Sequence, residues 1–306
     1  MKSIIRSKKQ WVAGVPLGGL GTGSVELRGD GSLREWQIFN NWGEPLELPN
    51  AFLAVWARAE GGRGRACVLE LAPRHNVPGV DRVDYRGEFP FAFLRYDIPG
   101  YPVRVSLEAF SPFIPHDPKN SAQPAFVLYF DLENRIEANC EASISVCVQN
   151  PFSKCVKAER KQQDTLILLS GEGENGNLNR YEVMAAALEP NASYCAPGHC
   201  QPERQAVEIW HSFASPRRHG KYSNTIADPR ATCAPLASST VLPPGQSKRL
   251  GFIVSWFSPD HVEIPSGRRV GHMYENWHST ARDVGHHRRQ TAAASRNARR
   301  QNPLSN

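Results

Sequence analysis

The pattern of hydrophobic and polar positions predicts β-strands along most of the chain, some alternating and some, such as 51–58, mostly apolar. In YPVRVSLEAF (101–110), Val103, Val105 and Leu107 alternate with polar residues, which is the period of two expected of a strand with one buried face. The other segments of strand character are 24–28, 33–39, 51–58, 124–134, 140–150, 164–170, 180–188, 206–213 and 249–258. Their separators are rich in Gly, Pro, Asn and Ser, as in antiparallel sheets joined by turns. The pattern predicts an all-β fold, a large two-sheet antiparallel β-sandwich.

A glycine-rich segment, GVPLGGLGTGS (14–24), precedes the first of these strands. A phosphate-binding P-loop needs Lys and then Ser or Thr directly after its closing glycine, where this chain has Leu20 and Gly21. A dinucleotide-binding loop opens a helix, whereas the residues that follow alternate as a strand and then turn at Gly29-Asp30-Gly31. The segment therefore leads into a β-hairpin, and we expect it to serve the fold and an interface rather than a phosphate.

The character of the chain changes near its C-terminal end. Residues 269–284 predict the start of a linker helix with Met273 and Trp277 on one side, after a sandwich domain over 1–268. Apolar periodicity is then lost, so 285–306 is expected to be a disordered basic tail. A helix with nothing to pack against favours a truncated or frame-shifted C-terminus, and a solvated basic tail is the simpler alternative.

Charge and cysteine content narrow the classes of function. The net charge is +6, but residues 281–306 carry six Arg and one Asp, so the rest of the chain is nearly neutral and no specific nucleic-acid partner is expected. No apolar run is long enough for a signal peptide or a transmembrane segment. Seven Cys without paired spacing indicate a reducing, cytoplasmic location.

The sequence offers few groups that could carry chemistry. The group formed by Cys195, His199, Cys200 and Cys233 lacks the close pairs of a zinc site, so neither a metal nor a cofactor is expected. His278 and Asp283 lie in WHSTARD, but G-x-S-x-G, the nucleophile motif of a Ser–His–Asp hydrolase, is absent. No local pair of carboxylates suggests a glycosidase.

A sugar-binding site is possible near the first hairpin. Trp36 and Trp42 could stack on a sugar ring, while the amides of Asn40 and Asn41 could bond its hydroxyls. The alternative is that Trp36 and Phe39 belong to the core or to an interface, as most large aromatic residues do.

Long motifs carry a family resemblance. GVPLGGLGTGSVELRGDGSLREWQIFNNWG resembles the opening segment of glycoside hydrolase family 116, which contains bacterial β-glucosidases and the non-lysosomal glucosylceramidase. YPVRVSLEAFSPFIPHDPKNSAQPAFVLYFDLEN resembles the middle block of the family, while FIVSWFSPDH and YENWHSTARDV resemble its last strand and first linking helix. The resemblance covers about residues 11–284.

The resemblance implies an N-terminal β-sandwich followed by an (α/α)₆ barrel that carries both catalytic carboxyl groups. No residue of this chain then inherits a catalytic role, and the chain alone is expected to be inactive. The full-length enzyme would be a retaining β-glucosidase acting on a β-glucoside or glucosylceramide.

The resemblance also implies where the partner barrel would lie, namely against the glycine loop and the hairpin. The expected interface residues are Leu17, Gly18, Gly19, Leu20, Gly21, Trp36, Phe39 and Trp277. An apolar patch is therefore expected near Leu17, Leu20, Trp36 and Phe39. Two alternatives stay open: a free-standing carbohydrate-binding module, and an active hydrolase with a site inside the sandwich.

Overall fold

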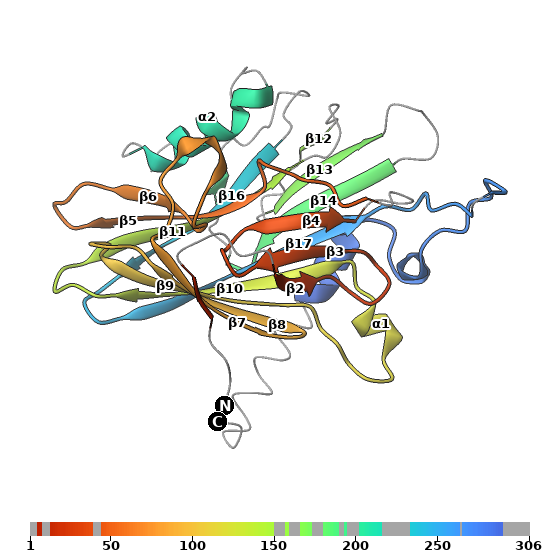
Figure 1. The fold of residues 1–306 in the computed structure, drawn as a ribbon, viewed down its shortest axis with the longest axis horizontal. Coiled ribbons are helices and arrows are strands. Elements are labelled where there is room, and N and C mark those ends of the chain that lie inside the picture. Colours follow the sequence, from red (N-terminus) through yellow and green to blue (C-terminus); the bar gives the residue numbers. More distant parts are fainter. Residues whose placement is uncertain are drawn as a thin grey trace.

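The computed structural model is built from three antiparallel sheets (Figure 1). It describes residues 5–7, 13–38, 44–149, 157–158, 166–172, 180–189, 193–194, 202–215, 233–263 and 265–289. The nine-stranded sheet has the order β1 (Ile5–Ser7), β7 (Arg82–Glu88), β8 (Phe91–Asp97), β9 (Val103–Phe110), β10 (Ala125–Asn134), β17 (Ser247–Phe257), β14 (Arg180–Ala187), β13 (Leu166–Glu172) and β12 (Lys157–Ala158).

A five-stranded sheet faces it. Its order is β15 (Ser193–Tyr194), β16 (Cys233–Leu242), β11 (Cys140–Gln149), β5 (Phe52–Ala59) and β6 (Arg65–Val68). The third sheet consists of β2 (Gly14–Leu17), β3 (Ser24–Arg28) and β4 (Leu33–Gln37). The predicted all-β sandwich is confirmed, and the predicted hairpin belongs to a separate small sheet in front of the two large ones in Figure 1.

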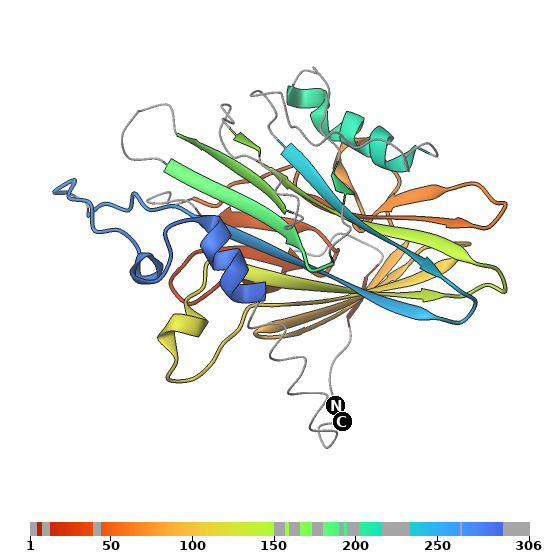
Figure 2. The same cartoon turned by 180° about the vertical axis from the view of Figure 1, so that it is seen from behind.

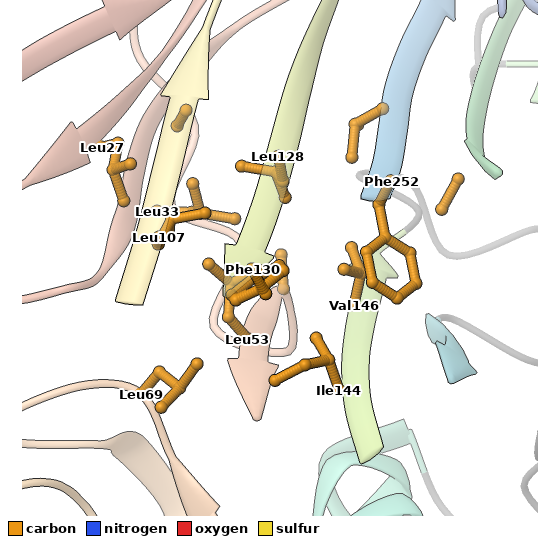
Figure 3. Close-up of a cluster of buried hydrophobic side chains, with 14 of the residues drawn as sticks. Leu27, Leu33, Leu53, Leu69, Leu107, Leu128, Phe130, Ile144, Val146 and Phe252 are labelled. Carbon is orange, nitrogen blue, oxygen red and sulfur yellow. The ribbon is translucent and has the colours of Figure 1, made fainter. Parts of the chain in front are cut away.

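One continuous core lies between the sheets. Leu128 and Phe130 of the nine-stranded sheet point toward Leu53 and Ile144 of the five-stranded sheet (Figure 3). All four side chains are fully buried, and burying each is worth roughly 1.5–3 kcal/mol. Leu27 and Leu33 bring the three-stranded sheet into the same core. The alternation predicted for 101–110 is confirmed, because β9 buries every second side chain.

The helix α2 (Pro202–Ala214) corrects one prediction. Residues 206–213 were predicted to form a strand. In the structure Ile209, Trp210 and Phe213 share one helical face, buried in a cluster on the five-stranded sheet. A periodicity of three to four therefore describes this segment, and the strand prediction was wrong.

The C-terminal end of the described chain also differs from the expectation. A 3₁₀ turn, η2 (Met273–Asn276), is followed by a helix over 281–289, so the helix continues past the boundary expected at 284. Ala281 and Val284 are fully buried against the nine-stranded sheet, and Figure 2 shows the dark blue helix crossing the outer face of that sheet. The expectation of a helix without a packing partner was therefore wrong. The rest of the predicted tail, 290–306, lies outside the described residues.

Candidate functional site

The glycine loop between β2 and β3 packs on its own chain. The indole Nε1 of Trp256 donates a 2.8 Å hydrogen bond to the carbonyl of Thr22, and the backbone N–H of Leu20 donates a 2.9 Å bond to the carbonyl of Ser121. At the start of the loop, the N–H of Gly18 donates to Ser111 Oγ at 2.6 Å. The loop is therefore tied to two distant parts of the sandwich.

Two glycines show why the loop tolerates no side chains at these contacts. A Cβ on Gly19 would lie 2.3 Å from the carbonyl oxygen of Gln123, and a Cβ on Gly23 would lie 2.1 Å from that of Gln37. Gly23 also adopts a φ of +88°, which side chains disfavour. The close approach expected of a partner domain is thus made at these positions by the protein's own backbone.

Two of the expected site residues are in the core instead. Leu17 is 0% and Trp36 is 1% exposed, so neither side chain can stack on a sugar or present a surface to another domain. The reason is that β2 and β4 belong to a sheet whose inner face closes the main core. Phe39, Asn40, Asn41 and Trp42 lie outside the described residues, so their roles stay predictions.

Leu20 and Trp277, unlike Leu17 and Trp36, are not fully buried. Leu20 lies at the tip of the glycine loop, where its side chain is 48% exposed, and Gly21 next to it faces open space. Trp277 is half-buried directly after η2, where its N–H donates to the carbonyl of Tyr274. Of the expected interface residues, Leu20 therefore has the clearest exposed apolar side chain.

Leu20 belongs to a group of exposed apolar side chains that we call the apolar corner: Leu20, Phe89, Phe113 and Ile114. The hydroxyl of Ser121 both accepts from the N–H of Ile114 and donates to its carbonyl, each at 2.9 Å, while the Ser121 carbonyl holds Leu20. Phe113 follows Ile114, with its ring centroid 6.1 Å from that of Phe89. The apolar corner is thus formed by three loops, between β2 and β3, between β7 and β8, and between β9 and α1.

The end of the 281–289 helix is fastened beside this corner. Arg288 donates a 2.8 Å hydrogen bond to the backbone carbonyl of Asn120, and the Nε2 of His287 lies 2.8 Å from Asn120 Oδ1. Asn120 belongs to the short helix α1 (Pro118–Ser121), whose first turn is capped by the carboxylate of Asp117. The last described turn of the chain therefore lies next to Ser121 and the apolar corner.

A second feature is a pocket on the opposite side of the main core. Its lining is Pro49, Phe52, Val68, Glu70, Pro73, Arg74, Val77 and Trp210. Glu70 is 6% exposed, and burial raises the pKa of its carboxyl group to about 7, although the charge of Arg34 opposes this shift. A glycosidase needs two carboxyl groups across the sugar, and Glu70 is the sole acid among the described residues that line this pocket. Glu70 was not predicted as a site residue, because it follows β6 outside any recognisable motif.

The described residues contain neither a cluster of metal ligands nor a membrane-spanning helix. Within the described ranges no three His, Cys, Asp or Glu residues are grouped so that they could hold a metal ion. Cys195, His199 and Cys200 lie outside those ranges, and Cys233 is buried in β16. None of the described helices has the length and apolar character needed to span a bilayer.

Comparisons with solved structures give distant similarities. A protein assigned as a kojibiose phosphorylase from the human microbiome is 9% identical, with a TM-score of 0.47 over 91% of this chain and 33% of its own length. The heparan sulfate lyase HepC from Pedobacter heparinus is 9% identical, with a TM-score of 0.35 over 78% of this chain and 31% of that one. The α-galactosidase AgaA from Geobacillus stearothermophilus is 10% identical, with a TM-score of 0.29 over 74% of this chain and 32% of its own length. This chain thus spans about a third of the length of these structures.

The sequence comparison is more specific. The model of the N-terminal part of glycosyl-hydrolase family 116, described as beta-glucosidase 2, matches residues 14–297. The match begins at the glycine loop and includes the whole helix at 281–289. The chain therefore belongs to the N-terminal domains of glycosyl-hydrolase family 116.

Proposed function

We propose that this chain is the non-catalytic N-terminal β-sandwich of a retaining β-glucosidase, and that it packs against and supports an (α/α)₆ catalytic barrel. The barrel would carry both catalytic carboxyl groups and act on a β-glucoside, with glucosylceramide as one such substrate. A cytoplasmic location is part of the proposal, supported by seven Cys without paired spacing.

One observation carries the supporting role, namely the seating of the 281–289 helix. Val284 is fully buried in a cluster with Val127 and Ile253, and Ser255 Oγ donates a 2.8 Å bond to the carbonyl of Ala281. A flexible linker between independent domains would make few such contacts. The helix is instead built into the sandwich, so it would hold a following domain in a fixed direction.

The first test uses the purified chain alone. It should not hydrolyse an aryl β-glucoside, because a single acid in the described pocket cannot perform a two-carboxyl reaction. Turnover that disappears in Glu70→Gln would contradict the proposal and indicate an active site within the sandwich. Saturable binding of a β-glucoside that is lost in Trp42→Ala would instead indicate a free-standing carbohydrate-binding module.

The second test adds a separately produced helical catalytic domain of a family 116 β-glucosidase, checked for folding by circular dichroism. The chain should raise the melting temperature of that domain, because a ligand that binds only the folded state stabilises it. Val284→Asp places a charge in the buried contact of the helix and should reduce the effect. Val241→Asp, at a position that is 63% exposed on β16, is the matched control. An unchanged melting temperature with the wild-type chain would refute the supporting role.

A further inference from the structure

Exposed apolar side chains are concentrated in one place on the described surface. The large hydrophobic residues that are clearly exposed there are Leu20, Phe89, Phe113, Ile114, Val241, Val270 and Met273. Four of these seven form the apolar corner, with exposed fractions of 45–56%. Such a cluster is unusual on a soluble monomer, where exposed hydrophobic residues are normally scattered, and it marks a contact surface.

The corner is held in a defined shape. Ser121 is 1% exposed and bonds to both Leu20 and Ile114. Asp117 keeps α1 in place through bonds from the backbone N–H and the side-chain amide of Asn120, at 3.0 and 2.6 Å. A surface that is already ordered loses little conformational entropy when a partner binds. The two phenylalanine rings are suited to act as anchors in such a contact.

The position of the corner relates it to the chain that follows. Arg288 and His287 both bond to Asn120, directly before Ser121. A domain that continues from the 281–289 helix would therefore start beside the corner. Covalent attachment at that distance gives a partner surface a high effective concentration, so even a modest contact would form.

The composition of the following residues argues that they do not cover the corner themselves. Residues 290–306 contain one Leu, no aromatic residue and three Arg. This segment offers no apolar face that would match four large hydrophobic side chains. The matching surface must belong to a larger apolar partner.

The polar surroundings of the corner carry charges of both signs. Lys119 on α1 and His116 on the preceding loop are exposed. Asp117 lies between them, and the hydrogen bonds from Asn120 lower the pKa of its carboxyl group, so the carboxylate keeps its charge beside that of Lys119. The apolar side chains, rather than a net charge, therefore define the corner.

From these contacts we infer that the apolar corner, rather than the buried face of the glycine-loop hairpin, is the docking surface for the helical catalytic domain. This inference rests on the proposed function. The occupant is an apolar face of one or more helices of that domain. The tip of the glycine loop contributes Leu20, and the loops around Phe89 and Phe113 contribute the two anchors.

Binding of the separately produced catalytic domain, measured by biolayer interferometry, tests the inference. Phe89→Asp and Phe113→Asp should each weaken binding at least tenfold. Val241→Asp, an exposed hydrophobic residue away from the corner, should bind like the wild type. Melting curves of every variant check that the sandwich stays folded, as expected for substitutions at exposed positions.

The outcomes separate the two proposals. If the wild-type chain does not bind the domain at all, both the supporting role and the docking surface are refuted. If the wild type binds and the phenylalanine variants bind equally well, the supporting role stands and the apolar corner is refuted. Sedimentation of the chain alone gives a further check, because self-association abolished by Phe113→Asp would assign the corner to a second copy and overturn the inference.

Discussion

The indole of Trp256 and the carbonyl of Thr22 are joined by a 2.8 Å hydrogen bond that spans 234 positions of sequence. Trp256 lies in β17, an interior strand that pairs with β10 and β14, and Thr22 lies in the glycine loop. Both residues are buried, so the bond is shielded from water. It fixes the loop that carries Leu20 to the last strand of the sandwich.

Trp256→Phe should destabilise the protein through loss of this bond. The Thr22 carbonyl would remain buried without its donor, at a cost of about 1–3 kcal/mol in addition to the lost ring contacts. Trp36→Phe is the matched control, because Trp36 is equally buried but, in the part of the chain that the structure describes, its Nε1 has no hydrogen-bond partner. Urea unfolding should show the larger loss for Trp256→Phe, with faster amide exchange at Leu20; equal losses would show that the bond contributes nothing.

Gly19→Ala and Gly21→Ala should differ strongly although they lie two positions apart. The new Cβ at 19 would collide with the backbone of Gln123, whereas the Cβ at 21 would meet open space. Gly21→Ala should still lower the free energy of unfolding by about 1–2 kcal/mol, because residue 21 has a φ of +68°, which a side chain disfavours. Gly19→Ala should cost more than that, because a backbone must move. Thermal unfolding of both variants measures the difference, and a less stable Gly21→Ala would contradict the described packing of the loop.

The free energy of unfolding should depend on the ionisation of Glu70. Burial raises the pKa of its carboxyl from 4.5 to about 7, so the folded state holds the proton more tightly than the unfolded state. The stability that this proton provides is fully present below about pH 4.5 and is lost as the pH rises to about 7. At about 1.4 kcal/mol per pKa unit, the loss is roughly 3 kcal/mol.

Glu70→Gln removes this titration while keeping the size of the side chain. Its unfolding free energy should change less than that of the wild type between pH 5 and pH 8, and it should be the more stable protein at pH 8. Denaturant unfolding across this range gives the comparison. Parallel pH profiles for the two proteins would show that Glu70 is not titrating in the folded state.

The seating of the 281–289 helix should weaken in acid. Burial is the largest cause that lowers the pKa of both His278 and His287. The charge of His287, whose ring centroid lies 5.6 Å from that of His278, lowers the pKa of His278 further. Arg288 and Lys119 add to this effect, while acidic neighbours partly oppose it. A lowered pKa stabilises the folded state above the ordinary value of 6.5, and this contribution is lost as the pH falls below it.

Amide exchange over 281–289 should therefore accelerate between pH 7 and pH 5 beyond the intrinsic dependence of exchange on pH. In His278→Gln the change should be smaller, and little else should be lost, because the Nε2 of His278 has no hydrogen-bond partner within the described residues. Amides of β9 in the same sample serve as the internal reference. Constant protection of the helix down to pH 5 would contradict this prediction.

Local alternation identified strands such as β9, which buries every second residue, whereas β10, β11 and β17 bury most of their residues on both faces and were predicted from their apolar, β-prone composition. The strand prediction failed at α2, where the side chains of Ile209, Trp210 and Phe213 meet a sheet formed by residues far away in the sequence. It also passed over β16, whose small and polar residues, such as Ser238, are buried between neighbouring strands. In both segments the secondary structure depends on contacts with residues distant in the sequence, which local alternation does not reveal.

The candidate site was predicted less well than the fold. The family resemblance directed attention to the glycine loop, and Leu20 is indeed exposed there. Leu17 and Trp36 were misplaced because sequence does not reveal which face of a small sheet closes the core. Phe89, Phe113 and Ile114 were not predicted, since they lie in loops that only the three-dimensional fold brings together.

The pairing of β17 with both β10 and β14 has a consequence for synthesis on the ribosome. On one edge, residues 127–134 pair with β9, which is already made, but on the other edge residues 125–133 pair with 247–255. More than a hundred residues must therefore be made before this second edge of β10 is covered. Until then β10 presents an unpaired apolar edge, which is prone to aggregation in a nascent chain. Many pairings of this span also slow folding. The sandwich should therefore close late, after β17 has left the exit tunnel, and chaperones that shield apolar strands should matter most during that interval.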